Sequence, residues 1–237
     1  MPRIDGRHGD ELRPVKVTPG FLSFAEGSVL IEMGLTRVVC TVSVQERIPS
    51  FISRGSGNGW VTAEYSMLPR ATHTRNNRGV SPRSQEIQRL IGRSLRSVVD
   101  MKVLGEMTLV VDCDVIQADG GTRCASITGA YVALYQAVQG MLRTGFLKGS
   151  PLRGSVAAVS VGVVAGEPML DLCYDEDSRA DVDFNIVMTN QGDMVEVQGT
   201  AEGRPFPRAT LDSLLSLAGR GIGELLQVQR SAIEGLK

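Results

Sequence analysis

Hydrophobic and polar positions alternate in short runs over much of the chain, as they do in β-strands that are buried on one face. Residues 28–32 and 37–44 form two such runs around a break that contains Gly34, which predicts a β-hairpin. The other strand-like runs are 60–65, 108–116, 156–164, 168–174, 184–189 and 194–199. The last four predict two more hairpins, whereas residues 1–14 and 48–59 predict irregular structure or loops.

Three other segments carry apolar residues at helical spacing. The first has Ser81 as a candidate N-cap and Pro82 at its first position, and the second runs from Thr122 to Leu142. The third opens at Thr210. The apolar stripe of the first helix consists of Ile87, Leu90, Ile91, Leu95, Val98 and Val99. The order strands, helix, strand, helix, strands, helix predicts an α+β fold of mixed sheets with packed helices.

Length and composition narrow the class of protein. A chain of 237 residues forms one large domain or two small ones, and its most plausible internal boundary is the break at 144–151. Hydrophobic residues make up 42% and charged residues 22%, as is usual for a globular protein. The formal net charge of −1 means that a nucleic acid could be bound only by a local basic patch.

The beginning of the chain and its hydropathy indicate no membrane partner. Residues 1–7 are charged and lack the apolar segment of a signal peptide, and no apolar run reaches membrane-spanning length. Zinc is not indicated, because the cysteines lack C-x-x-C spacing and histidines are few. We therefore expect a cytoplasmic protein with reduced, buried thiols. These residues are Cys40, Cys113, Cys124 and Cys173, with His8 and His73.

The predicted strand 108–116 meets the second predicted helix at a glycine turn, which we define as residues 119–122. The first N–H groups of a helix have no internal acceptor and lie at its positive end. Gly120 and Gly121 let the backbone approach a ligand, and Thr122 and Arg123 add a hydroxyl and a guanidinium. This combination suits a phosphate group. The alternative is an ordinary strand–turn–helix corner with Thr122 as N-cap.

Arginines dominate the segment from residue 70 to residue 96. Glu86 is its only carboxylate, and lysines are rare in the whole chain. Guanidinium groups bind phosphate oxygens bidentately, so this composition favours an anion-binding surface over a solvated face laced with salt bridges. On the predicted helix, Arg89, Arg93 and Arg96 lie opposite the apolar stripe. The arginines are Arg70, Arg75, Arg78, Arg83, Arg89, Arg93 and Arg96.

Carboxylates gather later in the chain, over nine residues. Oxygen ligands without nearby imidazole or thiolate suit a hard cation such as Mg²⁺. If the segment is extended, Asp181 and Asp183 share one face of a strand. The alternative is a solvated acidic turn. The cluster comprises Asp175, Glu176, Asp177, Asp181 and Asp183.

Arginines, a glycine turn and a carboxylate cluster together indicate phosphoryl chemistry. An anionic nucleophile that attacks a phosphodiester needs positive charge near both groups, which metal ions and guanidinium groups supply. No histidine has a clear role as general base. None is required if the nucleophile is inorganic phosphate, which is already ionised.

Five motifs carry a resemblance to a known family: residues 26–30, 60–72, 86–93, 112–128 and 195–200. They resemble bacterial ribonuclease PH, and the match runs nearly from end to end. The resemblance implies a single ribonuclease PH domain over 1–237, with lobes at about 10–145 and 150–230, and a ribosomal protein S5 domain 2-like fold. It implies a phosphate-dependent nucleotidyltransferase, that is, a phosphorolytic 3′→5′ exoribonuclease. Such an enzyme trims tRNA precursors and other RNA 3′ ends, releases nucleoside diphosphates and assembles as a homohexamer, a trimer of dimers.

The resemblance also implies roles for individual residues. The phosphate site falls on Arg83, Gly121, Thr122 and Arg123, and Arg123 is also implied to be catalytic. Asp177 and Asp183 resemble the catalytic and metal-binding acids, with Asp181 and then Asp175 as further candidate ligands of Mg²⁺ or Mn²⁺. The arginines implied to bind RNA are Arg70, Arg75, Arg78, Arg89 and Arg93.

One departure from the family pattern lies in the basic loop. The stretch from Asn76 to Arg83 is several residues shorter than is usual, and Pro82 stands where glycine is common. Two rival hypotheses are a non-catalytic ring subunit that only binds RNA and a hydrolytic nuclease. The first predicts loss of the acidic pair or the phosphate arginines, both of which this sequence retains, and the second predicts nucleoside monophosphates formed without phosphate.

Overall fold

The computed structural model describes residues 3–235 and contains two β-sheets. The larger sheet has the order β1-β2-β3-β5-β4. Neighbouring strands in it are antiparallel except β4 and β5, which run parallel. Its strands are β1 (Val15–Pro19), β2 (Gly27–Met33), β3 (Thr36–Gln45), β4 (Trp60–Met67) and β5 (Thr108–Gln117).

The smaller sheet is antiparallel and has the order β7-β6-β8-β9. Its strands are β6 (Val156–Val164), β7 (Glu167–Leu170), β8 (Val182–Thr189) and β9 (Met194–Ala201). The helices are α1 (Pro82–Arg96), α2 (Met101–Leu104), α3 (Thr122–Arg143), α4 (Tyr174–Asp177) and α5 (Arg208–Glu234). The predicted α+β class with mixed sheets and packed helices is confirmed.

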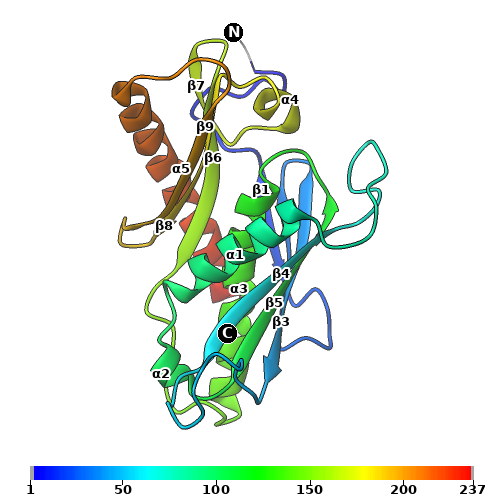
Figure 1. Cartoon of the computed structure of the whole chain (residues 1–237), viewed down its shortest axis with the longest axis vertical. Coiled ribbons are helices and arrows are strands. Elements are labelled where there is room, and N and C mark those ends of the chain that lie inside the picture. The colour runs from blue at the N-terminus through cyan, green and yellow to red at the C-terminus, as the bar shows by residue number, and fades with distance from the viewer. Residues whose placement is uncertain (1–2, 236–237) are drawn as a thin grey trace.

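Helix α3 connects the two sheets (Figure 1). It contacts β2 and β3 of the larger sheet and β6 of the smaller one, while α5 packs against β6 and β1. One continuous apolar core therefore extends through both sheets. Its largest fully buried side chains include Ile31, Leu109, Ile127, Leu134 and Ile186. Among residues 3–235, none of the helices combines the length and apolar character needed to cross a membrane.

The N-termini of α1 and α3, which carry the candidate site, are set by the residues at their caps. The Ser81 side chain accepts a hydrogen bond from the Ser84 N–H, the Ser84 side chain accepts one from the Ser81 N–H, and Pro82 occupies the first helical position. At the start of α3 the N-cap is Gly121, with φ of 63° and no side-chain cap. The alternative in which Thr122 is the N-cap is therefore wrong, because Thr122 is already inside the helix.

Several short elements differ from the sequence prediction. The strand predicted at 168–174 ends at Leu170, because Asp171 has φ of 53° and turns the chain into α4. Asp181 lies one residue before β8, so the structure does not place it in the strand with Asp183. Strand β1 and helices α2 and α4 were not predicted, and α5 begins two residues before Thr210.

The cysteine prediction is confirmed. All four thiols are free and buried. Burial raises the pKa of Cys124 to about 12, so this thiol stays protonated at neutral pH.

Candidate active site

The glycine turn is packed directly against the segment that leads into α4. Gly120 and Gly121 have φ of 70° and 63°, a backbone region that favours glycine. A Cβ added to Gly120 would lie 2.6 Å from the Leu172 carbonyl oxygen, so a larger residue has no space. Glycine is thus required at Gly120 both by its conformation and by the close approach of a second segment.

The hydroxyl of Thr122 is held from the neighbouring strand β4. The Tyr65 hydroxyl donates a hydrogen bond of 2.9 Å to Thr122 Oγ1, and both residues are buried. Burial raises the pKa of Tyr65, although the bond to Thr122 and the charges of Arg83 and Arg123 oppose the rise. The two predicted phosphate arginines therefore lie close enough to this hydroxyl pair to act on it electrostatically.

Arg123 is part of a polar network that joins three elements. Its Nη1 donates to Gln198 Oε1 on β9 at 2.6 Å and lies 3.8 Å from Glu86 Oε1 on α1. Gln198 Nε2 in turn donates to Glu86 Oε1 at 2.6 Å. The guanidinium is thereby held at the N-terminus of α3, where its charge adds to that of the helix end.

The structure brings two of the predicted acids close to these arginines. Burial raises the pKa of Asp177, at the end of α4, while the charges of Arg123, Arg83 and Arg13 oppose the rise. Burial also raises the pKa of Asp183 on β8, and repulsion from Asp177 raises it further. Both carboxyls thus lie within electrostatic reach of each other and of Arg123.

Exposure does not separate the predicted metal ligands. Asp175, Asp177 and Asp181 are exposed residues, Asp183 is half-buried, and Glu176 is buried in an ion pair with Arg3. Among residues 3–235, no group of three or more His, Cys, Asp or Glu side chains is arranged to hold a metal ion. Asp177 and Asp183 form a two-carboxylate set, which suits Mg²⁺ because this ion usually binds one or two carboxylates together with water and substrate phosphates.

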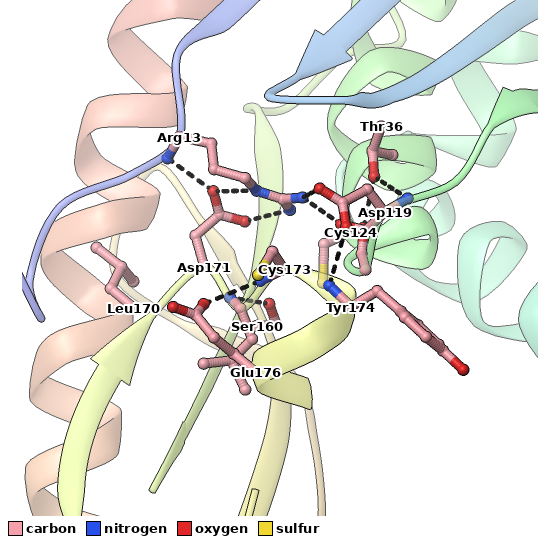
Figure 2. Close-up of polar contacts among 12 residues, drawn as sticks. Arg13, Thr36, Asp119, Cys124, Ser160, Leu170, Asp171, Cys173, Tyr174 and Glu176 are labelled. Atoms are coloured by element: carbon pink, nitrogen blue, oxygen red, sulfur yellow. Dashed lines mark hydrogen bonds and ion pairs between the residues drawn. The ribbon is translucent and has the colours of Figure 1, made fainter. Parts of the chain in front are cut away.

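Two buried ion pairs from the N-terminal segment support the candidate site, and sequence reasoning missed both. Arg3 forms a bidentate pair with Glu176, at 2.8 and 2.6 Å. Arg13 forms one with Asp171, at 3.0 and 2.7 Å, and also donates to the Asp119 carbonyl (Figure 2). No local pattern marks these residues, because their partners lie more than 150 positions away in the sequence.

The arginines predicted to bind RNA lie on the surface around α1. Arg70, Arg75 and Arg78 are exposed in the loop between β4 and α1, and Arg89 is exposed on the helix. Arg93 is exposed but paired with Glu196 on β9 at 2.9 Å. Arg96 departs from the predicted arrangement, because its guanidinium lies 4.4 Å from the centre of the Trp60 ring and donates to the Val61 carbonyl.

Comparison with known proteins decides the family. A model described as 3′ exoribonuclease family, domain 1, matches residues 11–138, and the model for domain 2 of that family matches residues 154–221. Ribonuclease PH from Dehalococcoides mccartyi is 60% identical over 235 residues, covering 97% of each chain. The chain belongs to the ribonuclease PH family. The predicted family and the predicted class of enzyme, a phosphorolytic 3′→5′ exoribonuclease, are therefore confirmed.

Solved structures agree with this ribonuclease PH assignment. The structure of rice (Oryza sativa) Rrp46 superimposes with a TM-score of 0.81 at 19% identity, covering 98% of this chain and 100% of that one, and this likeness concerns the fold. A chain of the Archaeoglobus fulgidus exosome, described with RNA bound to the active site, gives a TM-score of 0.80 at 25% identity and covers 95% of this chain and 91% of that one. The predicted fold family is confirmed.

Proposed function

We propose that this protein removes nucleotides one at a time from the 3′ ends of tRNA precursors and other RNAs, with inorganic phosphate as the attacking group. Nucleoside diphosphates are the released products. The observation that carries the proposal is the convergence of Arg83, Arg123 and the start of α3 around Thr122, with Asp177 and Asp183 nearby. The family assignment supports the same reaction class.

Inorganic phosphate binds at the glycine turn. The N–H of Gly121 and the first N–H groups of α3 have no acceptor within the helix, so they can donate to phosphate oxygens. Thr122 receives the hydrogen bond of Tyr65 on its oxygen, which leaves its own hydroxyl hydrogen for the phosphate. Arg123 and Arg83 supply two guanidinium groups whose planar forks match phosphate geometry.

The bound phosphate then attacks the last phosphodiester of the RNA. One phosphate oxygen forms a bond to phosphorus, and the bond from phosphorus to the 3′ oxygen of the preceding nucleotide breaks. Arg123 and Arg83 lower the repulsion between the two anions during this approach. The proton of the attacking hydrogen phosphate passes to the 3′ oxygen, so the shortened RNA ends in a 3′ hydroxyl and the product is a nucleoside diphosphate.

Asp177 and Asp183 would hold a divalent cation, and Asp181 or Asp175 could complete the set after a local adjustment. We propose Mg²⁺, with Mn²⁺ as the alternative, because the donors are all carboxylate oxygens. When bound, the cation supplies positive charge that offsets the negative charge developing on the leaving 3′ oxygen. Burial and then repulsion from Asp177 raise the pKa of Asp183, and a cation held by the two carboxyls would relieve that repulsion.

The exposed arginines around α1 would bind the RNA backbone. Arg70, Arg75 and Arg78 project from the loop before the helix, and Arg89 and Arg93 extend the same basic surface. Phosphate contacts of this kind give affinity without sequence specificity. Arg93 would have to exchange its pairing with Glu196 for a phosphate, so we expect it to contribute least.

We propose that the active form is a homohexamer, a trimer of dimers, in the cytoplasm. In support, the apolar side chains of Phe24, Phe51 and Val80 are largely exposed, with 102%, 69% and 71% of their reference surface accessible, so an interface that covered them would gain from burying apolar surface. A ring would also bring several basic loops to one RNA and increase its affinity by multivalency. Light scattering that shows a stable, fully active monomer would contradict this assembly.

We also propose that residues 1–237 form one ribonuclease PH domain, with lobes at about 10–145 and 150–230. The continuous core through both sheets supports this view. The end residues of that range, 1–2 and 236–237, lie outside the described part of the chain.

The proposed reaction is tested by leaving out phosphate. Purified protein is incubated with a tRNA precursor and Mg²⁺, with and without inorganic phosphate, and the products are separated by chromatography. We expect nucleoside diphosphates only when phosphate is present. Monophosphates formed without phosphate would indicate hydrolysis, and RNA binding without any product would indicate a non-catalytic subunit; either result would refute the proposal.

A further inference from the structure

The proposed site is built from two segments that are distant in the sequence. One is the glycine turn, which holds the phosphate, and the other is residues 171–177, which end at Asp177. The two segments are in direct contact, because the Tyr174 N–H donates to Asp119 Oδ1 at 3.2 Å and the Leu172 carbonyl oxygen packs against Gly120. The position of phosphate relative to the carboxylates therefore depends on how firmly this contact is fixed.

Arg13 lies between these two segments (Figure 2). Its Nε and Nη2 donate to the two carboxylate oxygens of Asp171, and its backbone N–H donates to Oδ2 at 2.9 Å. Its Nη1 donates to the carbonyl of Asp119, the first residue of the glycine turn. A Cβ added to Gly121 would lie 2.9 Å from Arg13 Nη2, so the guanidinium lies directly beside the turn.

The pair is deeply buried. The side chains of Arg13 and Asp171 are 3% and 1% exposed. Burial disfavours the charge of Arg13, but the hydrogen bonds and charge of Asp171 more than compensate and hold the pKa of Arg13 above its usual range. One charged fork thus connects both segments in an environment where an unpaired charge would be strongly unfavourable.

The backbone at Asp171 gives a second, independent sign of constraint. Its φ of 53° is in the left-handed region, which is uncommon for residues other than glycine, although aspartate adopts it more readily than most. This residue directly precedes Leu172, the residue that packs on Gly120. Three hydrogen bonds from Arg13 hold its carboxylate, and hence the direction in which the chain enters α4.

We propose that Arg13 and Asp171 are positioning residues that set the distance between the phosphate held at the glycine turn and the carboxylates Asp177 and Asp183. The proposal rests on the proposed function of this site. Neither residue needs to touch a substrate. A displacement of about 1 Å between reacting groups can lower a rate by on the order of 10²-fold, so a fixed spacing has a large effect on turnover.

The test uses Arg13→Lys, which keeps the charge but removes the fork, and Asp171→Asn, which keeps the shape and tolerates a left-handed backbone. The control is Leu104→Ala. Leu104 is fully buried in the core on α2, so its truncation should destabilise the fold, but it belongs neither to the glycine turn nor to residues 171–177.

We measure the KM for phosphate, kcat and the KM for RNA on the full chain, together with thermal unfolding. Both test variants are expected to raise the KM for phosphate or lower kcat by about 10-fold or more, with RNA binding unchanged. The control is expected to lower the melting temperature similarly but to keep the KM for phosphate close to that of the wild-type protein.

Unchanged phosphate kinetics in folded Arg13→Lys and Asp171→Asn would overturn the proposal, as would an equal change in Leu104→Ala. Loss of folding in both test variants would assign the pair a purely structural role and also overturn it. The wild-type protein distinguishes failure of the positioning role from failure of the proposed function. If the wild-type protein forms no nucleoside diphosphates when phosphate is supplied, the proposed function is refuted. If the wild-type protein is active and the variants are unaffected, only the positioning role is refuted.

Discussion

Replacing Arg123 by alanine tests the phosphate site most simply. The Arg123 side chain is 18% exposed and is held by Gln198 at 2.6 Å, so its guanidinium is already in place before a substrate arrives. Its removal takes away a fixed positive charge at the start of α3, and it leaves Gln198 with its second partner, Glu86. The fold should therefore be largely preserved while the anion site loses a principal ligand.

The size of the effect follows from the number of bonds lost. A charge-assisted hydrogen bond contributes about 1.5–3 kcal/mol, and a forked guanidinium can make two of them. With one bond partly replaced by water, we expect a loss of about 3 kcal/mol. Since about 1.4 kcal/mol corresponds to tenfold in rate, kcat/KM for phosphate should fall by on the order of 10²-fold or more.

The assay follows release of nucleoside diphosphates at limiting phosphate and saturating RNA. Arg123→Lys, which retains the charge but not the fork, should fall between wild type and Arg123→Ala. Arg143→Ala is the matched control, because Arg143 is exposed at the other end of the same helix. Near-normal turnover of Arg123→Ala at limiting phosphate would remove Arg123 from the mechanism.

Three further predictions concern the groups around this arginine. Tyr65→Phe removes the hydrogen bond to Thr122 and should lower kcat/KM for phosphate about fivefold, or ~1 kcal/mol, in steady-state kinetics; an unchanged value would show that the bond has no role. Gly120→Ala introduces both a left-handed alanine and a 2.6 Å contact, so thermal unfolding should show a loss of more than about 1 kcal/mol, and a melting curve equal to that of wild type would contradict the packing argument. Because burial raises the pKa of Asp177 and Asp183, these carboxyls gain protons at higher pH than free aspartate when no cation is bound. Protons and Mg²⁺ compete for the same carboxylates, so raising the Mg²⁺ concentration should move the acid limb of the pH–activity profile to lower pH; a limb that does not move with Mg²⁺ would refute their role as metal ligands.

The long elements of this fold were predictable because each has a strong periodic signal. In α1, the residues Ile87, Leu90, Ile91 and Leu95 are all buried, as their spacing indicates, and the capping residue Ser81 marks its beginning correctly. The hairpin of β2 and β3 and the helix α3 follow from the same reasoning. Local sequence predicts these elements because, in each of them, the spacing of the apolar residues shows both the type of element and the face that is buried.

Short elements were not predictable on that basis. Helix α4 has four residues, too few for a period, and its acidic sequence suggested only a turn or a metal site. It exists because Glu176 is held by Arg3 and by the Cys173 N–H, a contact that spans most of the chain. The predicted strand 168–174 failed at Asp171 for the same reason, since a distant arginine holds it in a left-handed conformation.

The residues of the candidate site also fall into those that the local sequence predicts and those that it does not. Arg83, Thr122 and Arg123 could be named from the glycine turn and the family motifs, and the structure places them together. Arg13 could not, because it lies in a segment that looks irregular and polar in the sequence. Its importance becomes visible only when its bidentate contact with Asp171 is seen beside the glycine turn.

The central claim is that inorganic phosphate itself breaks the RNA chain. The most direct measurement supplies ¹⁸O-labelled phosphate to the wild-type protein with a tRNA precursor and determines the mass of the released nucleotides. The account predicts nucleoside diphosphates that carry the label in their terminal phosphate. Unlabelled nucleoside monophosphates, formed at the same rate whether or not phosphate is present, would contradict it.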